Sequence, residues 1–166
     1  TSTAMGAGTN ATGQRSTSMG NYTTASGSMS VAMGYKALAA GDRSVAMGTD
    51  TRASDLNSLV IGQYNSSGYS VTSADSFSTS APAFVIGNGT TSNARSDAFK
   101  VMFNGDTYVS SSLYLGGTAI TSTAAELNIL DGVTSTATEL NILDGVTSTA
   151  AELNILDGVT STATEL

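Results

Sequence analysis

Serine, aliphatic and glycine positions recur with a constant period over the first third of the chain. The segment SVAMG at Ser30–Gly34 returns at Ser44–Gly48, and three related segments share the same frame. A further glycine follows half a period after three of them, at Gly13, Gly27 and Gly41, and Asp55 takes the fourth such place. The two glycines of each period leave two runs short enough for one strand each, with turns at the glycines. So strict a period predicts a solenoid.

Alternation within each repeat sorts the side chains into columns. One column holds Met5, Met19, Met33, Met47 and Ile61, its neighbour holds Thr3, Thr17, Val31, Val45 and Leu59, and a third holds Ala11, Ala25, Ala39 and Ala53. We expect the methionine column to face the alanine column inside a narrow coil, because large against small fills an interior without voids. The prediction is a parallel β-roll of five coils over residues 1–62, rising about 4.8 Å per coil. The alternative, a flexible Gly/Ser/Thr linker, would not keep such columns in register.

Residues 63–97 break this register. The next similar motif is FVIGNG at Phe84–Gly89. It lies further along the chain from SLVIG at Ser58–Gly62 than one repeat period would place it. We therefore expect an inserted loop that leaves the roll and one closing coil. Tyr64, Tyr69 and Phe77 lie in the loop and are candidates for ligand contact. The interpretation that we favour is a cap or neck between two segments.

Residues 98–117 predict a β-hairpin and one further strand. Phe99, Val101 and Phe103 alternate before an Asn-Gly turn, and that combination is a strong hairpin signal. Ser111–Gly117 predicts the extra strand, which ends at a pair of glycines. Isolated strands of this length are marginally stable alone. Their aromatic faces suggest packing against copies from other chains.

Residues 118–166 repeat with a period of 13, beginning with TSTAAELNILDGV at Thr121–Val133. Thr123 and Glu126 have the spacing of a capping box, and Gly132 suits the position after a helix end. Each repeat therefore predicts a short helical turn, a glycine stop and an extended link. Leu127, Leu130 and Val133 would form an apolar stripe that one thin chain cannot bury. We expect this shaft to require association with other chains.

Two resemblances agree with these predictions. The segment SVAMGYKALAAGDRSVAMG is similar to the head repeats of YadA-like trimeric autotransporter adhesins, over about residues 2–62. That family forms left-handed parallel β-rolls packed three side by side. The segment DAFKVMFNGDTYVSSSLYLGG and the TAAELNILDGVT repeats resemble tail fibres of bacteriophages. Together they imply a mainly β, elongated homotrimer: a 14-residue-repeat roll, a hairpin segment and a 13-residue-repeat shaft.

Charge and residue types narrow the possible functions. The net charge is −7, and the excess lies wholly in residues 121–166, which contain seven acidic residues and no basic one. This argues against nucleic acid and anionic membranes as partners. No apolar run approaches the length of a membrane-spanning helix, so we expect no membrane insertion. The chain opens and closes inside repeats, and we expect it to be a piece of a longer polypeptide.

The chemistry of an enzyme is not indicated. Cysteine and histidine are absent from the sequence, and no lysine neighbours a candidate serine nucleophile. Calcium-binding and phosphate-binding motifs are also missing. Rings of Asp131, Asp144, Asp157 or Asn128 near a trimer axis could hold a cation, but ordinary helix-ending turns are the interpretation that we favour. We assign no catalytic, cofactor-binding or metal-binding residue and expect no cofactor.

Three functions remain open at this stage. The first choice is an extracellular phage tail fibre segment, joined to other tail or baseplate proteins. It would extend a receptor-binding tip, with the host receptor (a glycan among the candidates) contacted outside this chain. The alternatives are the passenger of a bacterial trimeric surface adhesin and a self-assembling extracellular filament.

Overall fold

The computed structural model describes residues 1–129, 131–141, 144 and 147. The contacts between residues divide the chain into two compact units, Thr1–Ile120 and Thr121–Leu166. Each unit is described by itself below.

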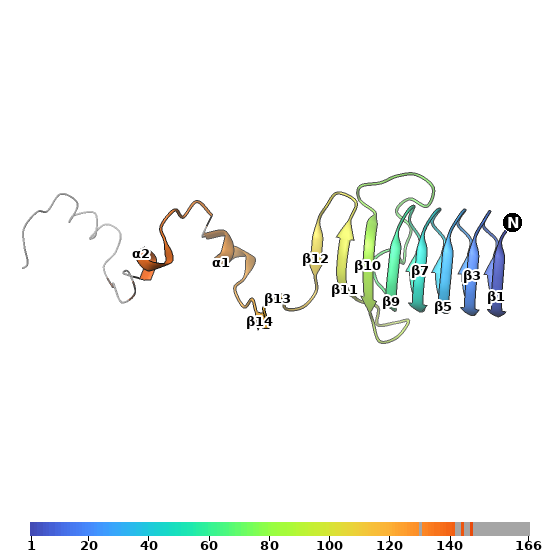
Figure 1. Ribbon diagram of the computed structural model, residues 1–166, viewed down its shortest axis with the longest axis horizontal. Coiled ribbons are helices and arrows are strands. Elements are labelled where there is room, and N and C mark those ends of the chain that lie inside the picture. The colour runs from blue at the N-terminus through green and yellow to red at the C-terminus, as the bar shows by residue number, and fades with distance from the viewer. Residues whose placement is uncertain (130, 142–143, 145–146, 148–166) are drawn as a thin grey trace, which may run out of the picture. The chain divides into compact units, whose positions relative to one another are not determined.

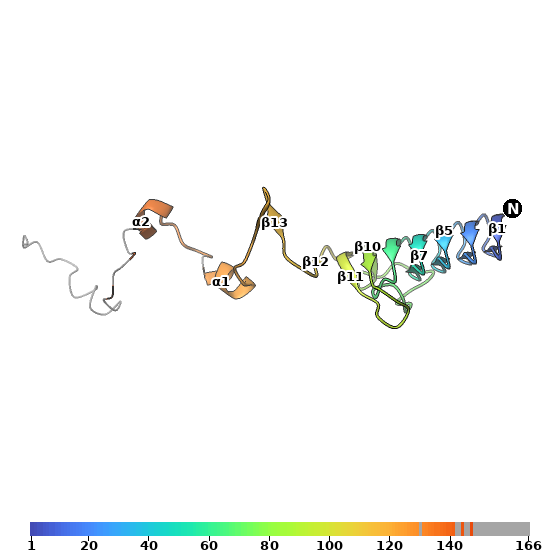
Figure 2. The ribbon, with the colours of Figure 1, turned by 90° about the horizontal axis from the view of Figure 1, so that it is seen from below.

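The first unit begins as a parallel β-roll with two sheets (Figure 1). Neighbouring strands of the first sheet pair in parallel, displaced by one sequence repeat, so that Met19 lies beside Met33 and Gly20 beside Gly34. These strands are β1 (Thr3–Ala7), β3 (Thr17–Asn21), β5 (Val31–Tyr35), β7 (Val45–Thr49) and β9 (Leu59–Gln63). The second sheet consists of β2 (Asn10–Ala11), β4 (Thr24–Ala25), β6 (Leu38–Ala39) and β8 (Arg52–Ala53). The predicted parallel β-roll is confirmed, and the row of stacked strands is visible in both views (Figure 2).

The interior of the roll contains small side chains on both walls, so the predicted placement of the methionine column was wrong. The residues fully buried inside the first sheet are Ser18, Ala32, Ala46, Val60 and Val85, and the alanines of β4, β6 and β8 face them. Met5 is 55% exposed and Met47 is 40% exposed, on the other side of the sheet. The alternation of side chains along each strand was predicted correctly, but the wrong face was predicted to point inward. The coil is too narrow for its two facing walls to include a row of large residues.

Buried hydroxyl groups complete this interior. The Oγ of Ser30 donates to the carbonyl of Gly27 at 2.7 Å, and Ser18 shares a 2.8 Å hydrogen bond with Thr23. Each of these buried polar groups thereby gains a partner, which removes most of the cost of taking it out of water. The recurring serine is therefore part of the packed interior in the four repeats that contain Ser16, Ser30, Ser44 and Ser58, whereas Ser2 in the first repeat is exposed.

Positive φ at the corners of the roll is not confined to glycine. The column of Gly6, Gly20, Gly34, Gly48 and Gly62 has φ between +96° and +129°, as turns at the glycines require. Two further columns with positive φ consist mostly of other residues: Tyr22, Lys36, Asp50 and Tyr64 in one, and Arg15, Met29, Arg43 and Asn57 in the other. Many of the repeated glycines are also needed for close stacking. A Cβ added to Gly34, whose φ is +118°, would lie 2.2 Å from the carbonyl oxygen of Gly48 in the next coil.

Beyond β9, the sheet of the roll continues through three more strands. Strand β10 (Pro82–Asn88) pairs in parallel with β9, with Leu59 beside Phe84 and Gly62 beside Gly87. This is the register expected from aligning FVIG with SLVIG. Strands β11 (Asp97–Met102) and β12 (Thr107–Val109) then form the predicted antiparallel hairpin, closed by a 2.9 Å hydrogen bond from Met102 N to Asp106 O.

The strand expected over residues 111–117 is itself part of a small hairpin. Strand β13 (Tyr114–Leu115) pairs with β14 (Thr118–Ala119) in an antiparallel two-stranded sheet. The Gly116-Gly117 pair, with φ of +58° and +87°, forms the two-residue turn between them. The paired glycines therefore reverse the chain rather than ending a single strand.

The described part of the second unit contains two short helices, α1 (Ala124–Ile129) and α2 (Ala137–Asn141). They begin at equivalent places of the 13-residue repeat, with Leu127 N donating to Thr123 O and Leu140 N to Thr136 O at 3.0 Å in both. The predicted helical turns are confirmed in these two repeats. The third repeat and the final STATEL lie outside the described residues. Within the described ranges, no helix is long and apolar enough to span a membrane.

Candidate functional site: an exposed apolar face and a polar closure

The first candidate surface is the side of the eight-stranded sheet that points away from the second sheet, which we call the outer face. Its register aligns large apolar side chains across strands from β1 to β12. They include Met5, Met19, Met33, Met47, Ile61, Ile86, Phe99, Val31, Val45, Leu59, Phe84 and Val101. The rings of Phe84 and Phe99 meet edge-on with centroids 6.1 Å apart, so the apolar column continues from the closing coil into the hairpin.

This arrangement has the chemistry of an assembly surface. Met47 is 40% exposed and Leu59 is 37% exposed, although both belong to a well-formed sheet. Apolar patches of such continuity on a single chain mark places where another protein surface packs. The same residues that were expected to fill the inside of the roll therefore lie where a second copy could cover them.

The helices of the second unit also expose apolar side chains. Leu127 is 47% exposed, Val133 44% and Leu140 40%, and α1 contains no buried residue. Leu130, the third member of the predicted stripe, lies outside the described residues. Helices of this length draw their stability mainly from packing, and no residue of α1 is buried against the residues that the structure describes.

The capping box of α1 is formed as expected. The carboxylate of Glu126 accepts from the backbone N–H of Thr123 at 2.7 Å and from its hydroxyl at 2.8 Å, and Glu126 N–H donates back to Thr123 Oγ1 at 3.2 Å. The backbone and hydroxyl hydrogen bonds from Thr123 lower the pKa of Glu126 below its ordinary value of 4.5. The cap therefore requires the ionised carboxylate.

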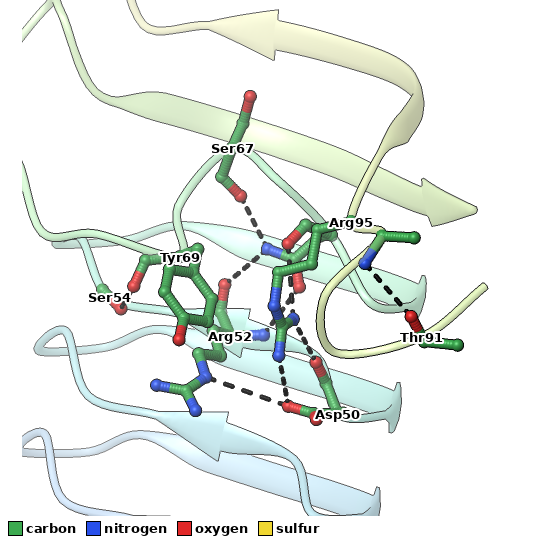
Figure 3. Close-up of polar contacts among 9 residues, drawn as sticks. Asp50, Arg52, Ser54, Ser67, Tyr69, Thr91 and Arg95 are labelled. Atoms are coloured by element: carbon green, nitrogen blue, oxygen red, sulfur yellow. Dashed lines mark hydrogen bonds and ion pairs between the residues drawn. The ribbon is translucent and has the colours of Figure 1, made fainter. Parts of the chain in front are cut away.

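A cluster of charged and aromatic residues closes the end of the roll (Figure 3). Arg95 donates through Nη2 to the Asp50 carboxylate at 2.8 Å and through Nη1 to the Asp50 carbonyl at 3.0 Å. Arg52 lies 3.9 Å from the same carboxylate oxygen. The guanidinium carbons of Arg52 and Arg95 each lie 4.3 Å from the ring centroid of Tyr69. This cluster ties the fourth coil to the inserted loop and to the segment before β11, because cation–π contacts and a largely buried ion pair join all three.

Asn65 takes the place of a strand at the edge of the second sheet. Its amide oxygen accepts from Arg52 N at 2.8 Å, and its amide nitrogen donates to Arg52 O at 2.9 Å and to Ser67 O at 2.6 Å. The side chain is fully buried. One amide group thus satisfies both backbone groups of β8 that a further coil would have bonded.

Two aspartates fix the loop that covers this end. Asp55, at 0% exposure, accepts from the backbone N–H groups of Thr72 and Ser73. Asp97 accepts from Ser66 N and Ser67 N, each at 2.8 Å. Asp55 stands where earlier repeats have glycine, because no further coil stacks on it.

The three aromatic residues expected as ligand contacts have different surroundings. The Tyr69 ring packs against two guanidinium groups, and the Tyr64 ring centroid lies 5.8 Å from the guanidinium carbon of Arg95. Phe77 is 62% exposed and packs edge-on against Phe103 at 5.2 Å. The loop therefore packs over the roll end, with Tyr69 39% exposed and Phe77 at the surface, and a role of these rings in ligand contact stays a prediction.

The candidate cation positions lie at helix ends. Asp131 N donates to Asn128 O, and Asp144 N to Asn141 O, each at 3.1 Å. Asp157 lies outside the described residues. Across the described ranges, no three His, Cys, Asp or Glu residues come together as metal ligands.

Sequence reasoning did not find the closure residues Asp50, Arg52, Asn65, Arg95 and Asp97. Asp50 and Arg95 are 45 residues apart, so no local pattern connects them. One signal was available, since Asp55 interrupts the series of half-period glycines at the coil where the roll ends.

Comparison with known families agrees with the roll. The model of the YadA head domain repeat (2 copies) matches residues 1–23, 25–51 and 39–65, which correspond to the coils from β1 to β9. Over these residues the chain is similar to YadA head repeats. No protein in the curated collection matches the chain.

Proposed function

We propose that this chain is a structural segment of a trimeric extracellular fibre, and specifically of a phage tail fibre that extends a receptor-binding tip for host attachment. The observation that carries the proposal is the outer face of the eight-stranded sheet. Several side chains of its continuous apolar columns are exposed in the part of the chain that the structure describes, and so are Leu127, Val133 and Leu140 of the second unit. Three copies packed around one axis would cover both kinds of surface.

The choice between a phage tail fibre and a bacterial adhesin depends on the hairpin and on the 13-residue repeats. The hairpin with its Asn-Gly-Asp turn and the 13-residue repeats resemble phage tail fibres, and both are formed as expected in the described residues. The YadA head repeats favour the second candidate, a passenger segment of a bacterial trimeric adhesin. In the first setting other tail or baseplate proteins would be partners.

The assembly part of the proposal is tested by the native mass of residues 1–166 in light scattering. We expect three times the chain mass of 16.6 kDa. Met33→Lys places a charge in the outer face and is expected to shift the mass towards that of one chain. Thr24→Lys is the matched control, because it adds the same charge at an outward position of the second sheet, where Arg52 occupies the equivalent place two coils later. A monomeric wild type would refute the trimer, and equal effects of both variants would refute the outer face as its interface.

The setting is tested separately by electron microscopy with antibodies raised against residues 1–120. Labelling of fibres on phage particles is expected. Labelling of the bacterial surface, with unlabelled particles, would overturn the tail fibre assignment in favour of the adhesin.

A further inference from the structure

The two sheets of the roll have different lengths, and this leaves one part of the first sheet without cover. The first sheet has eight strands, whereas the second has four and ends at β8, where Asn65 bonds its edge. Strands β11 and β12 consequently extend past the second sheet. Lys100 and Tyr108 are paired across these strands, on the face opposite to Phe99 and Val101. They therefore line a surface that no second sheet covers.

A groove of about 500 Å³ lies over this surface. One wall is formed by Ser66 and Ser67 of the inserted loop together with Arg95, and the other by Lys100, Tyr108 and Ser110 of the hairpin. Tyr108 is 48% exposed, so its ring remains accessible to a ligand. The volume falls in the range of small-molecule sites in proteins.

The charged residues that line the groove are Arg95, Asp97 and Lys100, and they differ in their partners. Both oxygens of Asp97 accept backbone N–H groups, and the guanidinium of Arg95 is paired with Asp50. Lys100 has no ion pair with a carboxylate among the described residues. Its ammonium nitrogen lies 4.4 Å from the ring centroid of Tyr108. The groove thus presents an ammonium group that has no ion-pair partner among the described residues, beside an aromatic face and several serine hydroxyls, while both oxygens of the Asp97 carboxylate accept hydrogen bonds from the loop.

We propose that this groove binds a carboxylated sugar, such as a uronic acid residue of a surface polysaccharide. The Lys100 ammonium would donate to the sugar carboxylate, a charge-assisted contact that is stronger than a neutral one. The Tyr108 ring offers an apolar face to the C–H groups of the pyranose, and the hydroxyls of Ser66 and Ser67 can exchange hydrogen bonds with those of the sugar. A neutral sugar would leave the ammonium unmatched.

This inference extends the proposed function, because it places one contact with a cell surface inside this chain. Lys100 and Tyr108 lie on the opposite side of β11 and β12 from Phe99 and Val101, so assembly through the outer face leaves these two side chains open to a ligand. Binding and assembly can therefore be measured independently.

The test is a chemical-shift titration of residues 1–166 with methyl β-D-glucuronide and, in parallel, with methyl β-D-glucoside, which differs from it at one carboxylate. We expect the glucuronide to shift the Lys100 and Tyr108 amide signals and to bind at least about tenfold more tightly than the glucoside, the effect of one charge-assisted contact. Equal affinities, or no binding of the glucuronide, would overturn the proposal. Acetate at the same ionic strength should compete poorly with the glucuronide for the groove. If acetate bound as tightly as the glucuronide, the groove would be a site for any small anion, and the proposal of a sugar site would be overturned.

Two variants locate the site. Lys100→Gln keeps most of the side chain and removes the charge, and we expect about a tenfold loss of glucuronide affinity. Lys36→Gln is the matched control, because Lys36 also lies over a tyrosine ring, that of Tyr35 at 5.3 Å, but outside the groove. Loss of affinity in the control, or none in Lys100→Gln, would refute the assignment. Native mass is recorded on the same samples, so a monomer that binds the glucuronide overturns the trimer and supports the groove.

Discussion

Replacing Gly34 with alanine tests whether the coils stack as closely as the structure has them. The new Cβ would lie 2.2 Å from Gly48 O, whereas real Cβ contacts essentially never fall below 3.0 Å. Strands β5 and β7 would have to separate by about 0.8 Å locally, which stretches a hydrogen bond of about 2.9 Å beyond its working range. Two ladder hydrogen bonds at about 1 kcal/mol each, and about 1–3 kcal/mol of strain at a φ of +118°, give a loss of about 3–5 kcal/mol.

Gly105→Ala is the matched control for this variant. Gly105 also has a positive φ, +95°, but a Cβ there would meet nothing within 4 Å. We expect it to lose only the strain, about 1–3 kcal/mol. Urea unfolding followed by circular dichroism, at one fixed protein concentration, measures both variants. If Gly34→Ala were no less stable than Gly105→Ala, the close approach of neighbouring coils would be wrong.

Three further perturbations address the roll closure, the roll interior and the helix cap. Asn65→Ala leaves two β8 backbone groups unpaired and should lower the free energy of unfolding by about 2–4 kcal/mol. The control Asn93→Ala, at an exposed turn, should leave the urea midpoint nearly unchanged. Equal midpoints of the two variants would contradict the strand-replacing role of Asn65. Ala39→Leu overfills the interior and should cost about 1–3 kcal/mol, so an unchanged midpoint would mean that the coil has spare room. The pKa of Glu126 is lower in the folded chain than its ordinary value, so the cap is present above that value and is lost as pH falls through the folded pKa. The Thr123 amide shift should therefore titrate with a midpoint below the ordinary value of 4.5, and Glu126→Gln should abolish that titration. A titration that persisted in the variant would belong to another group.

The parts of the fold that depend on local or repeated patterns could be predicted from the sequence. The register between coils, the Asn-Gly hairpin and the Thr123–Glu126 cap each arise from residues close together or at a fixed spacing. Such patterns act through backbone geometry that neighbouring residues determine.

Two features escaped prediction for physical reasons. Alternation divides a strand into two faces, but it does not say which face points inward, since that depends on the width of the coil. Met33 and Ala32 could therefore be exchanged in the prediction. The ion pair between Asp50 and Arg95 joins residues whose separation is 45, and the loop path that brings them together has no period.

Because each coil is displaced from the next by one sequence repeat, the length of this roll can change only by whole coils. Every pairing from β1 to β9 uses the same displacement of one repeat, and the closure depends on Asp50 and later residues. Duplicating or deleting one repeat upstream would lengthen or shorten the roll by about 4.8 Å and leave the closure unaltered. An insertion of another length within a coil would shift small residues out of the interior columns, unless it left the roll as a loop, as the segment between β9 and β10 does. Recombination between repeats is thus a route by which such a protein could change its span without redesigning either end.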